Sequence, residues 1–196
     1  MSKQIKTVIT TELKGRDKTT VFWRGVLVAP VAILLASFTQ MAKWGWFNTG
    51  IFVAPVILTL LFRGVYPSYV LAFNKAYIEF QTRFVAYVFL LTDEYPSIEA
   101  NSKVSVTLPE INGGATLSRG LPLVKWFLAI PLYIVGIAYT IAALAVSVVA
   151  WVVTFTTGEY PEWALEIVVG NIKYWNRVYG YAVLLVTDEY PSFSLN

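Results

Sequence analysis

The longest apolar stretch, Leu121 to Phe155, limits most strongly what this chain can form, because Lys125 near its beginning is its only charged residue. A single helix over this stretch would measure about 50 Å at about 1.5 Å per residue. The hydrocarbon core of a bilayer is only about 30 Å thick. We therefore expect two membrane spans joined by a tight turn near Gly136–Thr140. One steeply tilted helix is the alternative.

Two shorter apolar runs precede this stretch: Val21–Phe38, with Arg24 near its start, and Ile51–Phe62. Of all residues, 57% are hydrophobic and only 14% are charged. A soluble domain is about 45–50% apolar and about 25% charged. The sequence therefore predicts an all-α integral membrane protein with four spans, arranged as two transmembrane helical hairpins.

A segment with helical periodicity follows each predicted hairpin. Along Pro67–Leu91, and again from Pro161 to Val183, an aromatic and aliphatic face opposes a charged one. This pattern is typical of a helix lying in the bilayer interface. We expect two amphipathic interfacial helices, each with its proline at the first helical position. A helix packed onto a soluble domain is the alternative, disfavoured because little other chain exists to cover it.

The two halves of the sequence repeat each other. Thr92–Ser97 recurs letter for letter as Thr187–Ser192, and we call these segments the first and second TDEYPS box. Val186 has to be treated as a one-residue insertion. Because both halves run in the same order, we expect two tandem units of the same orientation. The matches upstream of the boxes are Gly64 with Gly158, Tyr66 with Tyr160, Pro67 with Pro161, Ile78 with Ile172, Arg83 with Arg177 and Tyr87 with Tyr181.

These features divide the chain into four parts. We expect a cytoplasmic N-terminal tail over residues 1–20, a first hairpin with its interfacial helix over 21–97, a linker over 98–120, and a second such unit over 121–196. The alternation of apolar and polar residues in Lys103–Leu108 predicts one short strand in the linker.

The distribution of cations predicts the topology. With four spans, all of the 15 Lys and Arg residues except Lys43 fall on the side shared by the tail, the linker and the C-terminal segment. The positive-inside rule puts that side in the cytoplasm. We therefore expect both termini, both interfacial helices and both TDEYPS boxes at one cytoplasmic boundary.

The TDEYPS boxes are the first candidates for a site. Each follows a helix and places adjacent carboxylates before a Tyr-Pro pair, which favours a helix stop held by a salt bridge to nearby Arg83 or Arg177. A site for a hard cation, or a docking motif, is the alternative. The candidate residues are Thr92, Asp93, Glu94, Tyr95, Pro96, Thr187, Asp188, Glu189, Tyr190 and Pro191.

Arg24 and Lys125 are the second pair of candidates, since each lies one or two turns into an apolar run. Charged residues at membrane depth are functional candidates, but both are close enough to an end to reach the lipid headgroups. We expect them to anchor the protein to lipid. A substrate pathway is the alternative.

The composition excludes several kinds of chemistry. The chain has no Cys and no His, which removes thiolate catalysis and the commonest general base and metal ligand. We predict no catalytic site, no metal site and no cofactor. The net charge of +3 is too small to argue for nucleic acid.

Several segments resemble a bacterial membrane family catalogued as a domain of unknown function, number 4389. They are Val104–Glu110, Leu117–Pro122, Leu123–Pro131, Phe155–Pro161, Trp175–Val178 and the terminal Thr187–Leu195. The resemblance is strongest from Val104 onward, and the first half departs from it at Arg63–Pro67, so we expect two tandem copies, the first more divergent. The resemblance implies the fold and location in the bacterial cytoplasmic membrane. It implies no activity.

The function we expect is that of a non-catalytic accessory or scaffold subunit, with membrane lipids and other membrane proteins, or further copies of itself, as partners. A small oligomeric transporter or channel is one alternative, and a lipid-binding membrane module is another. An enzyme would have to gather Asp93, Glu94, Asp188 and Glu189 at one surface.

Overall fold

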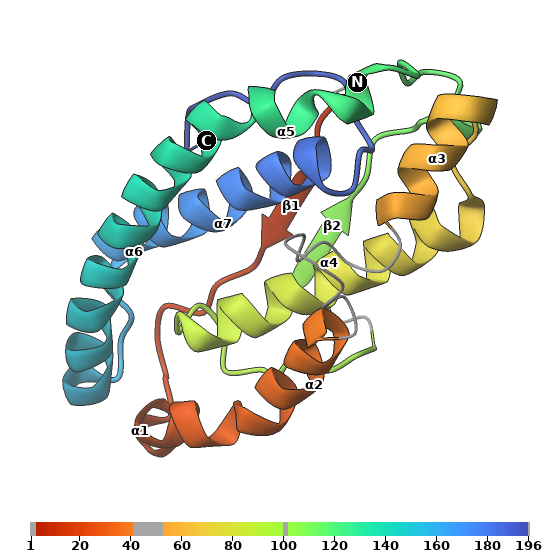
Figure 1. The fold of residues 1–196 in the computed structure, drawn as a ribbon. Coiled ribbons are helices and arrows are strands. Elements are labelled where there is room, and N and C mark those ends of the chain that lie inside the picture. Colours follow the sequence, from red (N-terminus) through yellow and green to blue (C-terminus); the bar gives the residue numbers. More distant parts are fainter. Residues whose placement is uncertain (1–2, 41–52, 100–101, 196) are drawn as a thin grey trace.

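The computed structural model describes residues 3–40, 53–99 and 102–195, and within these ranges the chain is mostly helical (Figure 1). The first half contains strand β1 (Lys6–Ile9) and helices α1 (Lys18–Leu27), α2 (Ala29–Gln40), α3 (Val53–Arg63) and α4 (Ser68–Val88). The second half contains strand β2 (Val104–Thr107), short 3-10 turns at Asn112–Gly114 and Leu121–Leu123, and helices α5 (Lys125–Leu128), α6 (Ile130–Thr157) and α7 (Glu162–Ala182).

Helix α6 is continuous over 28 residues, so the predicted turn at Gly136–Thr140 is wrong and the second hairpin does not exist. Gly136 is buried in the helix interior, and the Thr140 hydroxyl donates to its carbonyl oxygen at 2.8 Å. The helix ends only at Gly158, whose φ of 81° is the left-handed conformation that glycine adopts at a C-cap. The bilayer thickness that favoured two spans is no constraint on a helix that is tilted or that packs along another helix.

Two prolines mark equivalent breaks in the apolar runs. Helix α1 gives way to α2 just before Pro30, and α5 gives way to α6 just before Pro131. Proline lacks the N–H that would continue the ladder, which explains the break in each case. Each proline stands six residues after a cation, Arg24 in the first half and Lys125 in the second.

The predicted strand in the linker exists as β2, and it pairs with a second strand that the sequence analysis missed. Strand β1 runs antiparallel to it, in the register Lys6↔Thr107 to Ile9↔Val104. Residues 1–20 therefore contribute a strand to the fold and do not form only a tail, while the linker over 98–120 contains the strand that was predicted for it. Figure 1 shows the two strands in the middle of the molecule, between α4 and α7.

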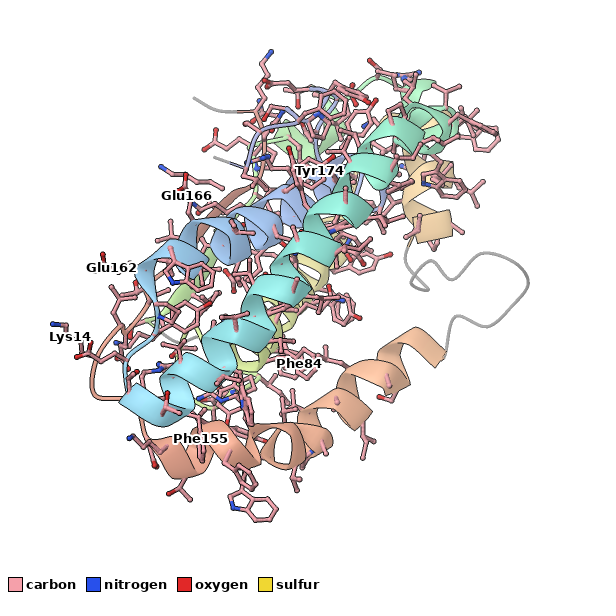
Figure 2. The ribbon with its side chains drawn as sticks, turned by 90° about the vertical axis from the view of Figure 1, so that its left-hand side faces the viewer. Lys14, Phe84, Phe155, Glu162, Glu166 and Tyr174 are labelled. Atoms are coloured by element: carbon pink, nitrogen blue, oxygen red, sulfur yellow. The ribbon has the colours of Figure 1, made fainter. Side chains whose placement is uncertain are left out.

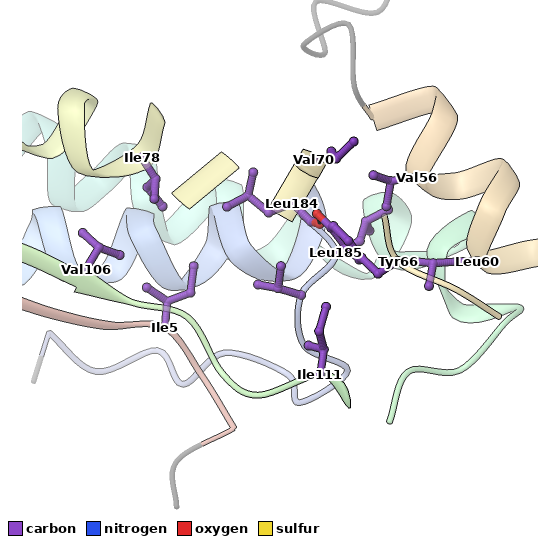
Figure 3. Close-up of a cluster of buried hydrophobic side chains, with 11 residues drawn as sticks. Ile5, Val56, Leu60, Tyr66, Val70, Ile78, Val106, Ile111, Leu184 and Leu185 are labelled. Carbon is purple, nitrogen blue, oxygen red and sulfur yellow. The ribbon is translucent and has the colours of Figure 1, made fainter. Parts of the chain in front are cut away.

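The apolar interior lies where these strands meet the helices. One cluster joins Ile5 of the N-terminal segment and Val106 of β2 to Ile78 of α4 and to Leu184 and Leu185, which follow α7 (Figure 3). A second cluster joins Leu90 and Leu91, which follow α4, to Val104 of β2 and Ile172 of α7. Fully burying such a side chain is worth about 1.5–3 kcal/mol, so the strands and helices depend on one another.

The two amphipathic helices exist, with Pro67 and Pro161 directly before their first residues, one position earlier than expected. Helix α7 is covered by α6 on one side and β1 on another, and buries Val168, Tyr174 and Val178. Such burial matches the alternative of a helix packed inside a folded domain, and the described contacts do not show α7 lying free in an interface. The reason is that α6, β1 and α4 supply the cover that the sequence seemed to lack.

Two helical segments are long and apolar enough to cross a membrane: Lys18–Ser37, which joins α1 to α2, and Ile130–Thr157, which is α6. Helix α3 is apolar but shorter. The predicted loop of the first hairpin, including Lys43, lies outside the described residues, so that hairpin stays a prediction.

The packing of α6 on α7 depends on Gly136. A β-carbon at this position would lie 2.7 Å from the Trp175 ring and 3.0 Å from the Tyr174 ring, whereas one at Gly25 of α1 would meet no atom of the described chain within 4 Å. We expect Gly136→Ala to lower the free energy of unfolding by about 1–3 kcal/mol through overpacking. Gly25→Ala should leave it unchanged or raise it by up to about 1 kcal/mol, because alanine favours the helix. Denaturant unfolding in detergent checks both, and equal effects would contradict this packing.

Candidate functional site: the two TDEYPS boxes

The first box is held by two arginines from the beginning of the chain. Arg24 of α1 forms an ion pair with Asp93, and Arg16 approaches the same carboxylate at 3.3 Å. Arg24 also donates to the carbonyl oxygens of Tyr87 at 2.8 Å and Thr92 at 3.0 Å, and its guanidinium lies 4.3 Å from the centre of the Tyr87 ring. This one side chain therefore joins α1 to the end of α4 and to the box.

The second box repeats this arrangement with a lysine. Lys125 of α5 pairs with Asp188 at 2.7 Å and donates to the Thr187 carbonyl oxygen at 2.7 Å. Its ammonium lies 5.2 Å from the centre of the Tyr181 ring. The backbone N–H of Ser118 donates to the other Asp188 oxygen at 2.6 Å and takes the place that Arg16 has in the first box.

The local backbone of the two boxes is also the same. The hydroxyls of Thr92 and Thr187 each accept from the N–H two residues later at 3.1 Å. The residues Leu90 and Leu185 both have a positive φ, 64° and 58°, in the turn that ends each helix. Leu90 is therefore equivalent to Leu185 and not to Leu184, and the inserted residue lies before Leu185 rather than at Val186. The repeat preserves a geometry as well as letters.

The tyrosine and proline of each box complete the arrangement. Tyr95 packs edge-on against Tyr87, and Tyr190 against Tyr181, with ring centroids 5.8 and 5.6 Å apart. Both Pro96 and Pro191 are buried. The Tyr190 hydroxyl donates to the Leu128 carbonyl oxygen at 3.0 Å. The boxes thus pack back onto the start of the long helices.

Burial and pairing oppose each other at the second box. Burial lowers the pKa of Lys125, and the hydrogen bond and charge of Asp188 offset part of that shift. Burial raises the pKa of Asp188, but the hydrogen bonds from Lys125 and Ser118 outweigh it, and the net pKa is lowered. An ammonium whose side chain is 0% exposed is tolerated here because a carboxylate lies beside it.

The structure corrects the predicted roles of the four cations. Arg24 and Lys125 are only 4% and 0% exposed, so they are structural ion-pair partners and do not reach outward to lipid headgroups. Arg83 pairs with Glu79 and donates to the carbonyl oxygens of residues 97–99, and Arg177 donates to the Ser194 carbonyl oxygen. Neither pairs with the acids of its box. The salt bridge that was predicted for each box exists, but with a different cation.

Sequence reasoning missed Arg16 and Ser118, and it missed that Arg24 and Lys125 are equivalent. One signal was available for the pair: the spacing from Arg24 to Pro30 equals that from Lys125 to Pro131. No comparable signal pointed to Arg16, which lies in a polar segment far from Asp93 in the sequence.

The two halves are completed by each other. The Tyr66 N–H of the first half donates to the Gly113 carbonyl oxygen of the second at 2.8 Å, and the Tyr160 N–H of the second donates to the Leu13 carbonyl oxygen of the first at 2.7 Å. The Tyr66 hydroxyl donates to the Leu184 carbonyl oxygen at 2.8 Å. Each glycine–x–tyrosine–proline step is therefore fixed by the partner half.

The two boxes are not gathered into one site. The first packs on α1 and the second on α5, and Figure 1 shows these helices at opposite ends of the molecule. The four carboxylates of a hypothetical carboxylate enzyme are therefore split into two distant pairs. In residues 3–40, 53–99 and 102–195, no three acidic side chains come together in a way that could hold a metal ion.

Comparison with known proteins places the second half in context. Residues 122–194 match the family model described as domain of unknown function DUF4389. The match supports one copy of this domain, α5 to the second box, and not the two tandem copies expected. Neither the curated proteins nor the solved structures give a match to the chain.

The Lys125–Asp188 pair predicts an asymmetric response to mutation. Asp188→Asn leaves a fully buried ammonium unpaired and should lower the free energy of unfolding by about 3–5 kcal/mol. Lys125→Met should cost less, because the remaining carboxylate is 20% exposed and water can solvate it. The double variant should recover part of the loss of Asp188→Asn. A double-mutant cycle of denaturant unfolding in detergent measures this, and strictly additive losses would contradict a direct pair.

Proposed function

We propose that the protein is a non-catalytic accessory or scaffold subunit embedded in a membrane, where it packs against lipid and other membrane proteins. The observation that carries this proposal is the outer face of α6. Ile134, Ile141 and Val148 on this face are 62–66% exposed, and every exposed side chain from Ile130 to Phe155 is apolar. In water such a continuous apolar surface favours association.

The inner face of α6 explains why the outer one is left to lipid. Leu132, Gly136, Ala143, Ala150 and Thr154 are buried at helical spacing against the rest of the molecule. Small residues at such a seam let the neighbouring helix approach closely, as in membrane helix packing. The small residues of α6 therefore face inward and its large apolar side chains face outward, whereas a helix of a soluble protein exposes a polar face.

The same seam weighs against the transporter or channel alternative. The hydroxyls of Thr140, Ser147 and Thr154 each donate to the carbonyl oxygen four residues earlier, at 2.6 to 2.8 Å. The Thr140 hydroxyl also accepts from the Trp175 indole at 2.8 Å. Hydroxyl groups that are hydrogen-bonded within the protein in this way do not line a hydrophilic path across the membrane.

Large apolar side chains on α1 and α2 extend the lipid-facing surface. Phe22, Trp23, Val26 and Ile33 are each more than half exposed. The charged groups lie elsewhere: Figure 2, which faces α6, shows Lys14, Glu162 and Glu166 along its left-hand edge. We propose that α6 and α1–α2 face lipid, that the two strands face water, and that both TDEYPS boxes lie on the water side. The resemblance favours a bacterial membrane, and we propose that this water side is the cytoplasmic one.

Single-cysteine variants test this orientation, since the chain has no native cysteine. Ile141 on α6 and Val8 on β1 are both well exposed apolar residues, at 62% and 50%. We expect Ile141→Cys in vesicles to resist a water-soluble maleimide and to react with it after detergent is added, whereas Val8→Cys reacts in intact, inside-out vesicles. Equal reaction of both variants in intact vesicles would remove the lipid-facing role of α6.

Two further variants test the position of the boxes. Glu94 and Glu189 are exposed members of the first and second box, so Glu94→Cys and Glu189→Cys should both be labelled from the cytoplasmic side only. Right-side-out and inside-out vesicles separate the two sides. Labelling from opposite sides would mean that α6 crosses the whole bilayer and would overturn the proposed orientation, although not the membrane location.

The accessory role itself is tested by purification in mild detergent and identification of what remains bound. A stoichiometric membrane protein that crosslinks to the outer face of α6 supports the scaffold role. A homo-oligomer without another partner favours the transporter alternative, and bound lipid alone favours the lipid-binding module.

A further inference from the structure

A pocket of about 520 Å³ lies between the outer edge of β1 and helix α7. Residues 4–9 line one side of it, and Val169, Lys173 and Arg177 of α7 line the other. Side chains alternate between the two faces of a strand, so a hollow lined by six consecutive residues follows the edge of the strand and not one face. The three residues of α7 are four positions apart and form one stripe of the helix. The pocket is therefore bounded by a strand edge and a helix, which Figure 1 shows side by side.

The backbone of β1 offers free hydrogen-bonding groups to this pocket. Antiparallel strands exchange hydrogen bonds at every second residue, and the Thr10 N–H, which donates to the Lys103 carbonyl oxygen at 2.7 Å, fixes which residues of the ribbon these are. The backbone groups of Thr7 and Ile9 therefore point away from β2. Within the described residues these groups have no hydrogen-bond partner. One edge of the ribbon thus remains open to a further strand.

The opposite edge of the ribbon, on β2, is covered by an acidic side chain. The outward N–H of Val106 donates to the Glu79 carboxylate of α4 at 3.3 Å. The residue of α7 that stands 94 positions after Glu79 is Lys173, and an ammonium cannot accept a hydrogen bond. At this position α7 therefore gives the edge of β1 a cation instead of an acceptor.

The pocket is also positively charged. Lys6 lines it from the strand and Lys173 from the helix, and none of the described residues of its lining is acidic. Neither lysine forms an ion pair with the part of the chain that the structure describes. Arg177 donates to the Ser194 carbonyl oxygen within the chain, so the two lysines are the cations that can meet a partner. A ligand of this pocket should therefore be acidic.

The dimensions fit an extended peptide. The stripe from Val169 to Arg177 is about 12 Å long at about 1.5 Å per residue, which equals about four residues of a strand at about 3.3 Å each. A peptide that adds to a sheet edge gains main-chain hydrogen bonds, and the side chains around it select its sequence. The β1 strand of a second copy fits less well, because it would bring another Lys6 next to the first.

We propose that this pocket binds an extended acidic segment of a partner protein, which adds a third strand to the ribbon between β1 and α7. The backbone of the segment pairs with the outward groups of Thr7 and Ile9. Adjacent side chains of the segment point to opposite faces, so one acidic side chain meets Lys6 on the exposed face of the ribbon and the next meets Lys173 beside α7.

This partner is additional to the lateral contacts proposed above, because the site is built from β1 and α7 and not from the outer face of α6. A protein that fails the vesicle-labelling test can still bind the acidic segment. A protein that does not bind the segment can still present α6 to lipid. The two failures are therefore distinguishable.

Fluorescence anisotropy of labelled peptides with the full-length protein in a non-ionic detergent tests the proposal. The probe is the blocked hexapeptide Thr-Val-Glu-Glu-Val-Thr, and its counterpart has two lysines in place of the glutamates. A third peptide keeps the glutamates but is N-methylated at its four central residues, which removes the N–H groups that a strand donates. We expect the acidic peptide to bind at least about tenfold more tightly than either of the others.

Three protein variants test the position of the site. Lys173→Glu introduces the residue type that α4 has at Glu79, so it should fold as well as the wild type, and it should weaken binding of the acidic peptide by at least about tenfold because repulsion replaces attraction. Lys6→Glu makes the same change at an exposed position of β1 and should have the same effect. Lys75→Glu, at an exposed position of α4, should leave binding unchanged. Melting temperatures show which variants are folded, and Lys6→Glu decides if Lys173→Glu is unstable.

Tight binding of the acidic peptide alone, with loss in the two pocket variants and not in Lys75→Glu, supports the site. Absence of binding, or equal binding of the acidic and lysine peptides, overturns it. Equal binding of the N-methylated peptide also overturns it, because charge attraction without strand pairing would then explain the affinity. A dimer of the wild type that Lys173→Glu dissociates, without any peptide binding, would assign the edge to a second copy and would likewise overturn the proposal.

Discussion

The fold depends on a buried cation that joins the beginning of each half to its end. Arg24 and Lys125 stand just before the long helices, and each reaches an aspartate that follows the amphipathic helix more than 60 residues later. A buried charge is costly when alone and tolerable when paired and hydrogen-bonded. The contact therefore specifies one arrangement. The end of each half has to pack against its beginning, because otherwise the buried cation would have no partner. The tight TDEYPS turns keep the aspartates at that position.

The exchange of segments between halves makes this arrangement cooperative. Within the described residues, strands β1 and β2 form a sheet of two strands, and a two-stranded ribbon is marginal by itself. Here β2 is covered by α4 and β1 by α7, so each strand is stabilised by a helix of the other half. The Gly113 and Leu13 carbonyls anchor the two tyrosine–proline steps in the same crossed manner. Neither half buries its apolar surface without the other, which explains why a segment that looks like a polar tail is part of the interior.

The features of the fold that could be predicted from the sequence were those determined by neighbouring residues. The starts of α4 and α7 follow from proline, which cannot continue a preceding helix, and β2 follows from strict alternation over a few residues. The repeat itself was plain in the letters, and it correctly marked the places where equal geometry recurs. The partners of the TDEYPS aspartates were not predictable. Arg83 and Arg177 are near the boxes in sequence, but tertiary packing brings Arg24 and Lys125, which are far away in sequence, to the aspartates. The continuity of α6 was missed because bilayer thickness was taken as a limit, while its packing along α7 decides its length.

A repeat that preserves its framework makes its exceptions informative. The ion pairs, the leucines with positive φ and the hydrogen bonds between the halves all recur. A difference in residue type at an equivalent position is therefore easy to recognise, because the structure around it is the same. Glu79 and Lys173 are such a difference, and it reverses the sign of a charge beside a conserved arginine. In the first half the strand edge, the arginine and the carboxylate satisfy one another, and that half is closed. In the second half a lysine stands at that position, and Lys173 and Arg177 line the pocket between β1 and α7 together.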